Sequence, residues 1–176
     1  MQIRMATSID RDDIRSTYLC AFPESENNIV AKLAIDLLDE STKPHTISLV
    51  AEIDNSVVGH VAFSPVKIDN NDNLQGYILA PLAVEPDCQK QGVGSKLIER
   101  GMDTLRNSGV TIVFVYGDPE FYGRYGFSTD NAEKFLPQHK LQYPFGWQAI
   151  VLRQFSNECI AGNIVCVASL ENPELW

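Results

Sequence analysis

Two glycines that follow an apolar stretch are the residues whose type and spacing first suggest chemistry in this chain. The run Tyr77–Val84 is short, apolar and bounded by polar residues, as is typical of a buried strand. A polar turn over Glu85–Gln91 follows, and Gly92 and Gly94 then precede a stretch with the apolar periodicity of a helix. The first turn of a helix has N–H groups without intrahelical partners, and glycine lets an anion approach the backbone. The spacing therefore predicts an anion-binding loop, although a plain strand-to-helix turn would use the same glycines.

Two common phosphate-binding loops do not fit this sequence. A P-loop requires Gly-Lys followed by Ser or Thr, whereas Gly94 is followed by Ser95 and then Lys96. The dinucleotide-binding fingerprint requires a third glycine, and Leu97 occupies that position. The predicted anion site therefore belongs to another class of loop.

Two segments resemble the GCN5-related N-acetyltransferase (GNAT) superfamily, and in particular a poorly characterised subgroup of predicted N-acetyltransferases. The run Gln89-Lys90-Gln91-Gly92-Val93-Gly94 resembles the family motif in which Gln or Arg is followed by x-x-Gly-x and then Gly or Ala. The preceding residues Leu82–Pro86 resemble the family's fourth strand and its exit. Downstream, Phe121–Phe127 resembles its Phe-Tyr-x-x-x-Gly-Phe segment. The two motifs occur in the family's order, and the resemblance covers the chain to about residue 130.

This resemblance implies transfer of an acetyl group from acetyl-coenzyme A to a primary amine of a small molecule or peptide, by direct attack in a ternary complex. It implies that amides of the central strand polarise the thioester carbonyl and that the glycine loop binds the cofactor. Tyr122 matches the family tyrosine that protonates the departing thiolate, and a phenol with a pKa of about 10 suits that role. Tyr125, three residues later, is the competing assignment. The resemblance assigns cofactor binding to ten residues: Leu82, Ala83, Val84, Gln89, Lys90, Gln91, Gly92, Val93, Gly94 and Ser95.

The general base is the group that the sequence identifies least directly. Glu26 opens a segment, Glu26-Asn27-Asn28-Ile29-Val30, that resembles a Glu-x-x-Leu-Val element of the same subgroup. We therefore predict Glu26 as a catalytic residue; the alternatives are an ordinary acidic residue in a first helical turn, with a water chain as the base. We interpret His60 as a hydrogen-bonded structural residue of a strand rather than as a base.

The charge and composition of the chain limit its classes of partner. The formal net charge of −9 disfavours nucleic acid, which is bound through clustered Lys and Arg. No apolar run approaches the roughly 20 residues that span a bilayer, and the N-terminus lacks the core of a signal peptide. The four cysteines show no CxxC pair, which predicts free thiols and no metal site. We expect a cytoplasmic protein without a membrane partner, and the sequence leaves a homodimer open.

The hydrophobic periodicity predicts alternating strands and helices. Pro65 predicts a bend or a sheet edge within its strand, and residues 131–144 are predicted to be loop. The strands are expected at residues 1–6, 46–53, 57–68, 77–84, 110–116, 148–152 and 164–168, with a further strand starting at 126–128. The helices are expected from Ser8 or Asp10 to Pro23, from Ser25 to Lys43, from Val93 to Ser108 and, as a short turn, over Glu120–Tyr125.

We predict a single N-acetyltransferase domain over residues 1–176. Its expected fold class is α/β, a GNAT-like mixed sheet that is mostly antiparallel, has a splayed parallel central strand pair and is flanked by helices. The rival hypothesis is a non-catalytic module that binds or senses acyl-coenzyme A. Tyr122 argues against this rival, and the lack of an evident base argues for it.

Overall fold

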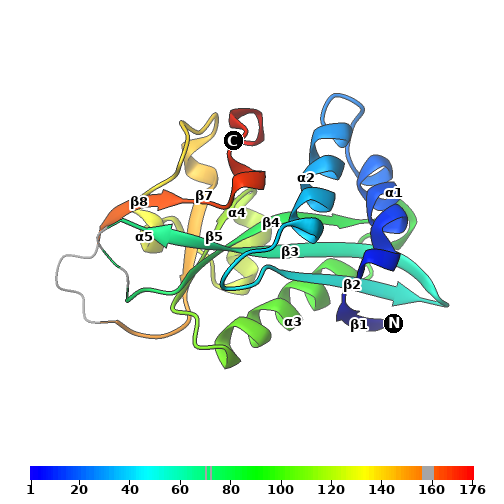
Figure 1. The fold of residues 1–176 in the computed structure, drawn as a ribbon, viewed down its shortest axis with the longest axis horizontal. Coiled ribbons are helices and arrows are strands. Elements are labelled where there is room, and N and C mark those ends of the chain that lie inside the picture. The colour runs from blue at the N-terminus through cyan, green and yellow to red at the C-terminus, as the bar shows by residue number, and fades with distance from the viewer. Residues whose placement is uncertain (70, 72, 156–160) are drawn as a thin grey trace. The chain divides into compact units, whose positions relative to one another are not determined.

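The computed structural model describes residues 1–69, 71, 73–155 and 161–176. Its elements follow the predicted order as far as β5, with boundaries within a few residues of those expected, and α2 begins at Asn27 rather than Ser25 (Figure 1). The helices and strands are β1 (Gln2–Met5), α1 (Arg11–Ala21), α2 (Asn27–Asp39), β2 (Ile47–Ile53), β3 (Ser56–Ile68), β4 (Gly76–Val84), α3 (Val93–Asn107), β5 (Ile112–Tyr116), α4 (Pro119–Tyr122), α5 (Thr129–Ala132), β6 (Phe135–Leu136), β7 (Trp147–Val151) and β8 (Gly162–Val165).

The described strands form an eight-stranded sheet. Six of the strands lie side by side in the order β1-β2-β3-β4-β5-β7. The pairs β1–β2, β2–β3 and β5–β7 are antiparallel, whereas β4 and β5 are parallel. A parallel pair needs a long connection, which here contains α3. Off this path, β8 pairs with both β3 and β6. The predicted mixed α/β sheet with a parallel central pair and flanking helices is therefore confirmed.

The chain divides into two compact units. The first consists of Met1–Phe63 and Ala80–Asp103, together with Leu175; the second consists of Ser64–Leu79 and Thr104–Glu174, together with Trp176. The elements β3, β4 and α3 each contribute residues to both units. A single domain over residues 1–176 stays a prediction, and the two units are described in turn.

In the first unit, α1 and α2 lie side by side and share a core with β2 (Figure 1). Ile14 and Tyr18 of α1 are fully buried, as are Ala34 of α2 and Val50 of β2. The apolar residues of both helices recur at intervals of three and four, which places them on one face. Both amphipathic helices therefore bury the stripe that their sequences predict.

Helix α3 packs against β3 on the face opposite α1. Successive side chains of a strand point to opposite faces, and His60 of β3 contacts Tyr18 of α1 whereas Phe63 lies against α3. Gly101 of α3 makes that approach possible, because a Cβ there would lie 2.1 Å from the Phe63 ring. The predicted apolar stripe of this helix is buried throughout, at Val93, Leu97, Ile98, Met102 and Leu105.

Strand β3 changes partner close to Pro65. Its register with β2 ends at Phe63, and its register with β8 covers Lys67 and Ile68. Proline has no N–H to donate to a ladder, so it is compatible with the gap between the two registers. The bend or sheet edge predicted near Pro65 falls where β3 changes partner from β2 to β8.

The second unit departs most from the sequence-based prediction. Part of the predicted loop over residues 131–144 forms α5 and the two-residue strand β6, and the strand predicted from Gly126 is reduced to a single bridge between Ser128 and Ala149. Elements of two to four residues are too short to show a periodicity, so the sequence could not predict them. The predicted strands β7 and β8 are present. β7 pairs with β5, whereas β8 pairs with β3 and with β6. We predict residues 156–162 to connect β7 and β8, and residues 156–160 lie outside the described residues.

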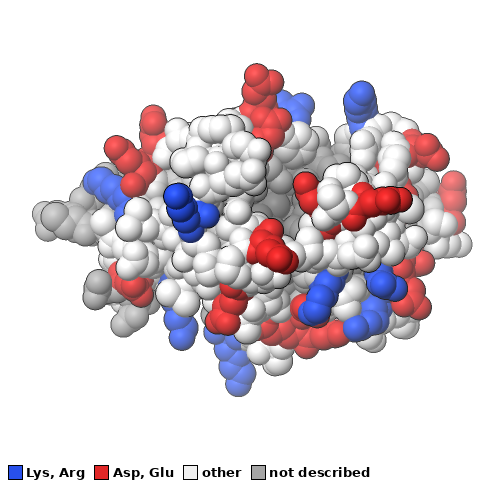
Figure 2. All heavy atoms as spheres, turned by 90° about the horizontal axis from the view of Figure 1, so that it is seen from above, with Lys and Arg blue, Asp and Glu red and all other residues white. Residues whose placement is uncertain are grey.

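Charged side chains of both signs are interspersed on the face shown in Figure 2. Within the described residues, no helix has the length and apolar character needed to cross a membrane. In the same part of the chain, no group of three or more His, Cys, Asp and Glu residues could hold a metal ion. Cys20, Cys88 and Cys166 are free thiols, and Cys159 lies outside the described residues.

Candidate active site

The ten residues predicted to bind the cofactor lie between the end of β4 and the first turn of α3. Leu82–Val84 end β4, Pro86–Cys88 form one 3-10 turn, and α3 begins at Val93. Among the described residues, the register between β4 and β5 covers Gly76–Leu79 of β4, so Leu82–Val84 continue the strand beyond that ladder. The structure thus brings the ten residues together in one contiguous segment of the first unit, which we call the cradle (residues 82–95).

Two glutamine side chains stabilise the cradle from within. Gln89 Nε2 donates to the carbonyl oxygen of Val84 at 3.0 Å, and Gln91 Nε2 donates to that of Asp87 at 2.7 Å. Each such bond contributes about 1 kcal/mol net to the stability of the loop. The two side-chain amides therefore shape the loop, which leaves backbone N–H groups as the predicted contacts to a ligand.

Gly92 has a backbone conformation that favours glycine. Its φ is +82°, and a Cβ built there would have no protein atom within 4 Å. Lys90 also has a positive φ, of 59°, so the turn before α3 passes twice through the left-handed region. The glycine is therefore explained by backbone conformation rather than by crowding, and the space beside it is open to a ligand.

The start of α3 provides donors for an anion. Its first backbone bond runs from the N–H of Lys96 to the carbonyl oxygen of Gly92 at 3.1 Å. The N–H groups of Val93 and Gly94 precede this bond, so the helix itself offers them no acceptor. The 15-residue helix adds the positive end of its dipole, and the exposed Lys90 and Lys96 add positive charge. The cradle therefore fits a pyrophosphate group.

Replacing Gly92 with Asp is expected to lower the affinity for coenzyme A by well over tenfold, which corresponds to about 1.4 kcal/mol or more. The substitution places a negative charge in the open space at the start of α3. Isothermal titration calorimetry with coenzyme A measures the loss, and circular dichroism checks the fold. The matched control is Gly92→Asn, because Asn has the shape of Asp and tolerates a positive φ without carrying the charge. Wild-type affinity in the Asp variant would contradict the assignment of the cradle.

Tyr122 ends the short helix α4 in the second unit. Asp118 caps this helix, because its carboxylate accepts a hydrogen bond from the N–H of Glu120 at 2.9 Å. The N–H of Tyr122 in turn donates to the carbonyl oxygen of Asp118 at 3.0 Å. Pro119 occupies the first position of the helix, where its missing N–H costs nothing. The capped turn therefore fixes the backbone of Tyr122.

The ring of Tyr122 is held by its neighbours within the second unit. It packs edge-on against Phe121, with centroids 4.9 Å apart, and against Phe127 at 5.9 Å. Gly117 leaves room for the ring, since a Cβ there would lie 2.5 Å from a Tyr122 ring carbon. No local signal in the sequence revealed this packing role of Gly117.

Burial raises the pKa of the Tyr122 phenol above its usual value near 10, and the charges of Tyr125 and Asp118 raise it further. The phenol therefore keeps its proton at neutral pH, as a proton donor must. Tyr125 is half-buried and packs on Phe121 at 5.6 Å. These features are compatible with Tyr122 as the acid, and the assignment stays a prediction.

Glu26 lies in the first unit as an exposed residue at the N-terminal boundary of α2. Its backbone carbonyl accepts from the N–H groups of Ile29 and Val30 at 3.1 Å, which closes the first helical turn. The side-chain amide of Asn27 donates to the carbonyl oxygen of Leu19 at 3.2 Å and links α2 to α1. The position of Glu26 is thus defined by the helix start, and its catalytic role stays a prediction.

His60 is a fully buried structural residue, as predicted from the sequence. Its Nδ1 lies 2.9 Å from the hydroxyl of Tyr18, and its Nε2 lies 2.7 Å from the hydroxyl of Ser48. Burial lowers the pKa of His60 from 6.5 to about 3, against a smaller opposing effect of Asp10. Neutral His60 therefore joins α1, β2 and β3 by hydrogen bonds, and its two partners were not identifiable from the sequence.

Comparison with known proteins gives consistent matches to one family. The model of the acetyltransferase (GNAT) domain matches residues 44–129. The uncharacterised N-acetyltransferase YjhQ of Escherichia coli is 40% identical over 130 residues, which cover 73% of this chain and 70% of that protein. The crystal structure of the GNAT family N-acetyltransferase YhbS from Escherichia coli in complex with CoA has a TM-score of 0.84 at 29% identity, covering 97% of this chain and 92% of that chain. A GNAT family acetyltransferase from Brucella melitensis in complex with acetyl-CoA has a TM-score of 0.68 at 28% identity, covering 97% of each chain.

Proposed function

The chain belongs to the GNAT family and is an acetyl-coenzyme A-dependent N-acyltransferase, and we propose that it acetylates a primary amine of a small molecule or peptide by direct attack in a ternary complex. The observation that carries the proposal is the cradle, in which the start of α3, the open space at Gly92 and two exposed lysines combine. Acetyl-coenzyme A, the co-substrate, supplies the activated acetyl group. We further propose that residues 1–176 act as one N-acetyltransferase domain, because three elements run through both units.

Each predicted residue has a chemical task in this proposal. The backbone N–H groups of the cradle bind the pyrophosphate, and those of Leu82–Val84 polarise the acetyl carbonyl. Tyr122 holds a proton on its phenol oxygen and donates it to the departing sulfur. Glu26 attracts the ammonium form of the acceptor and takes up the proton that the amine must lose, directly or through water.

A transfer assay over a panel of amines and short peptides tests the proposed function. Release of free coenzyme A thiol together with an acetylated product would support it. Tight binding of acetyl-coenzyme A with no transfer to any member would instead favour the rival hypothesis, a non-catalytic binding or sensing module. A chain that fails to bind acetyl-coenzyme A would contradict both readings.

Glu26→Gln is expected to raise the KM for the acceptor or to lower kcat, with binding of acetyl-coenzyme A unchanged. An amine with a Lys-like pKa near 10.4 arrives protonated at neutral pH, and the substitution removes the carboxylate that would attract it and accept its proton. The deficit should narrow as pH rises, because more of the amine then arrives neutral. Steady-state kinetics from neutral to alkaline pH measures this trend.

Glu24→Gln is the matched control for this experiment. Glu24 is also an exposed carboxylate of the segment between α1 and α2, but it does not occupy the helix boundary. If Glu26→Gln has wild-type kinetics throughout the pH range, Glu26 is an ordinary solvated residue at a helix start and water acts as the base.

A further inference from the structure

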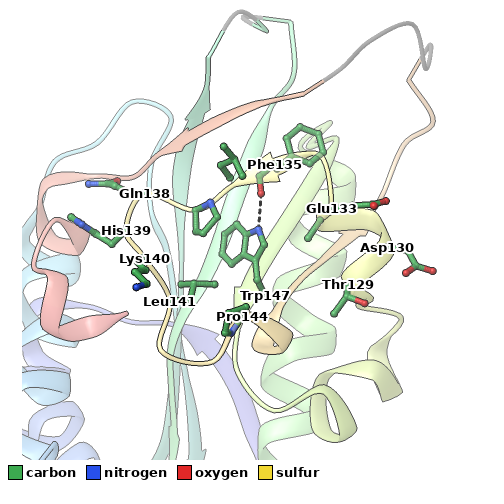
Figure 3. Close-up of a pocket in the computed structure, with 13 residues that line it drawn as sticks. Thr129, Asp130, Glu133, Phe135, Gln138, His139, Lys140, Leu141, Pro144 and Trp147 are labelled. Carbon is green, nitrogen blue, oxygen red and sulfur yellow. Dashed lines mark hydrogen bonds between the residues drawn. The ribbon is translucent and has the colours of Figure 1, made fainter.

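The second unit contains a pocket of about 760 Å³ that is built wholly from residues 129–147 (Figure 3). Its residues come from α5 and the adjoining Glu133, from β6, from the first residue of β7 and from the segment between β6 and β7. Sites for small molecules typically have volumes of about 300–1,000 Å³ and combine apolar walls with a few polar groups. The size of this pocket is therefore that of a small-molecule site.

The middle of the pocket is apolar and firmly packed. Trp147 donates its Nε1 hydrogen to the carbonyl oxygen of Phe135 at 2.9 Å, and its ring stacks on Phe114 with centroids 5.3 Å apart and planes 6° apart. Trp147 and Phe135 are 6% and 4% exposed, so their positions are fixed by the core of the unit. Leu141, which is also buried, extends this apolar surface. The wall is therefore preformed, and Leu136, which is 60% exposed, presents apolar surface that a ligand can reach.

Charged groups of opposite sign lie on the two sides of this wall. Figure 3 shows Lys140 with His139 and Gln138 on one side of Trp147, and Glu133 with Asp130 on the other side. The first side is anchored, because Gln138 Oε1 accepts from the N–H of Cys166 at 2.6 Å and the ring of His139 packs on that of Trp176, with centroids 5.9 Å apart. Lys140, Glu133 and Asp130 are exposed and can adjust to a ligand.

We propose that this pocket binds a zwitterionic short peptide with apolar side chains. The peptide's carboxylate pairs with Lys140, its ammonium group pairs with Asp130 and Glu133, and its apolar side chains pack on the apolar lining, in which Leu136 is an exposed residue. A simple anion or a simple cation would leave the charges on one side of the pocket uncompensated, whereas a zwitterion satisfies both sides. The volume accommodates two residues better than one. The proposal concerns binding alone and does not depend on acetyl transfer.

Calorimetric titration in the absence of acetyl-coenzyme A tests this inference with three related ligands. The probes are the dipeptide phenylalanyl-leucine, its C-terminal amide and its N-acetyl derivative, so that each derivative lacks one of the two charges. The free dipeptide is expected to bind at least about tenfold more tightly than either derivative. The intrinsic tryptophan fluorescence should change in the same titrations, because Trp147, one of the two tryptophans of the chain, lines the pocket.

Two sets of variants then assign each charge to one side of the pocket. Lys140→Ala should abolish the preference for the free dipeptide over its amide and keep the preference over the N-acetyl derivative. The double variant Asp130→Asn with Glu133→Gln should abolish the preference for the free dipeptide over its N-acetyl derivative and keep the preference over its amide. Lys134→Ala and Glu171→Gln are the matched controls, because these exposed residues do not line the pocket, and both preferences should remain.

The proposal is overturned if the three ligands bind the wild-type protein equally, or if none of them shows saturable binding up to about 1 mM. It is also overturned if the control variants change the preferences as much as the pocket variants do. All the substituted side chains are exposed, so the fold should be kept, and thermal unfolding of each variant checks this.

Discussion

Tyr122→Phe is expected to lower kcat for acetyl transfer by roughly 10²-fold or more, the usual scale for removal of a general acid. The substitution keeps the ring that packs between Phe121 and Phe127 and removes only the hydroxyl. The KM for acetyl-coenzyme A should change little, because the cradle is untouched. Because the pKa of Tyr122 is raised above 10, loss of its proton should not reduce the wild-type rate below about pH 10. Steady-state kinetics with an accepted amine measures these expectations.

Tyr125→Phe is the internal control for the acid. Tyr125 is half-buried in the same segment and contacts the same Phe121 ring, so its substitution perturbs the same surroundings. If Tyr125→Phe lowers kcat and Tyr122→Phe leaves it unchanged, the general acid is Tyr125 and the assignment of Tyr122 is wrong. Equal wild-type rates in both variants would mean that neither tyrosine protonates the leaving group.

The stability of the protein is expected to fall as pH falls from 6.5 towards 3, because of His60. The pKa of His60 is about 3 in the folded protein and 6.5 for the unperturbed side chain, so His60 stays neutral in the folded protein at a pH where the unfolded chain binds a proton. Between these values the unfolded chain binds one proton more than the folded chain, so acid favours unfolding by about 1.4 kcal/mol for each pH unit. The loss should reach about 2.7 kcal/mol at pH 4.5. Urea denaturation at pH 7.5, 5.5 and 4.5 measures this slope.

His60→Gln is the variant that isolates this effect. Glutamine can still donate and accept hydrogen bonds towards Tyr18 and Ser48, but it does not titrate. The variant should be less stable at pH 7.5. Above pH 4.5, its free energy of unfolding should depend less steeply on pH than that of the wild type, by the equivalent of about one bound proton. Identical slopes in the two proteins would contradict the assignment. The window stops at pH 4.5 because Arg4 lowers the pKa of Asp10 to about 2, and Asp10 contributes stability that is lost below its unfolded value near 3.8.

The sequence predicted those elements whose hydrophobic pattern or motif lies within one continuous segment of the chain. The apolar stripe of α3 is a repeat within a single helix, and its burial follows from the spacing of Val93, Leu97, Ile98, Met102 and Leu105. The cradle is likewise contiguous, so its strand, turn and helix could be predicted from residues 77–108. The family could be inferred for the same reason, because its two motifs are short runs in a fixed order.

Other features depend on residues that are far apart in the chain, and only the tertiary structure decided them. Tyr18, Ser48 and His60 come from three elements, and the hydrogen bonds that keep His60 neutral exist only after those elements pack. The strand β6 has two residues, too few for any periodicity, and it forms because β8 supplies its backbone partner. The side of Trp147 on which each charge of the pocket lies also depends on how α5, β6 and β7 pack. The sequence by itself determined the local segments and the cradle, whereas the partners of buried polar groups and the shape of the pocket required the fold, because contacts between distant residues leave no periodic pattern in either partner.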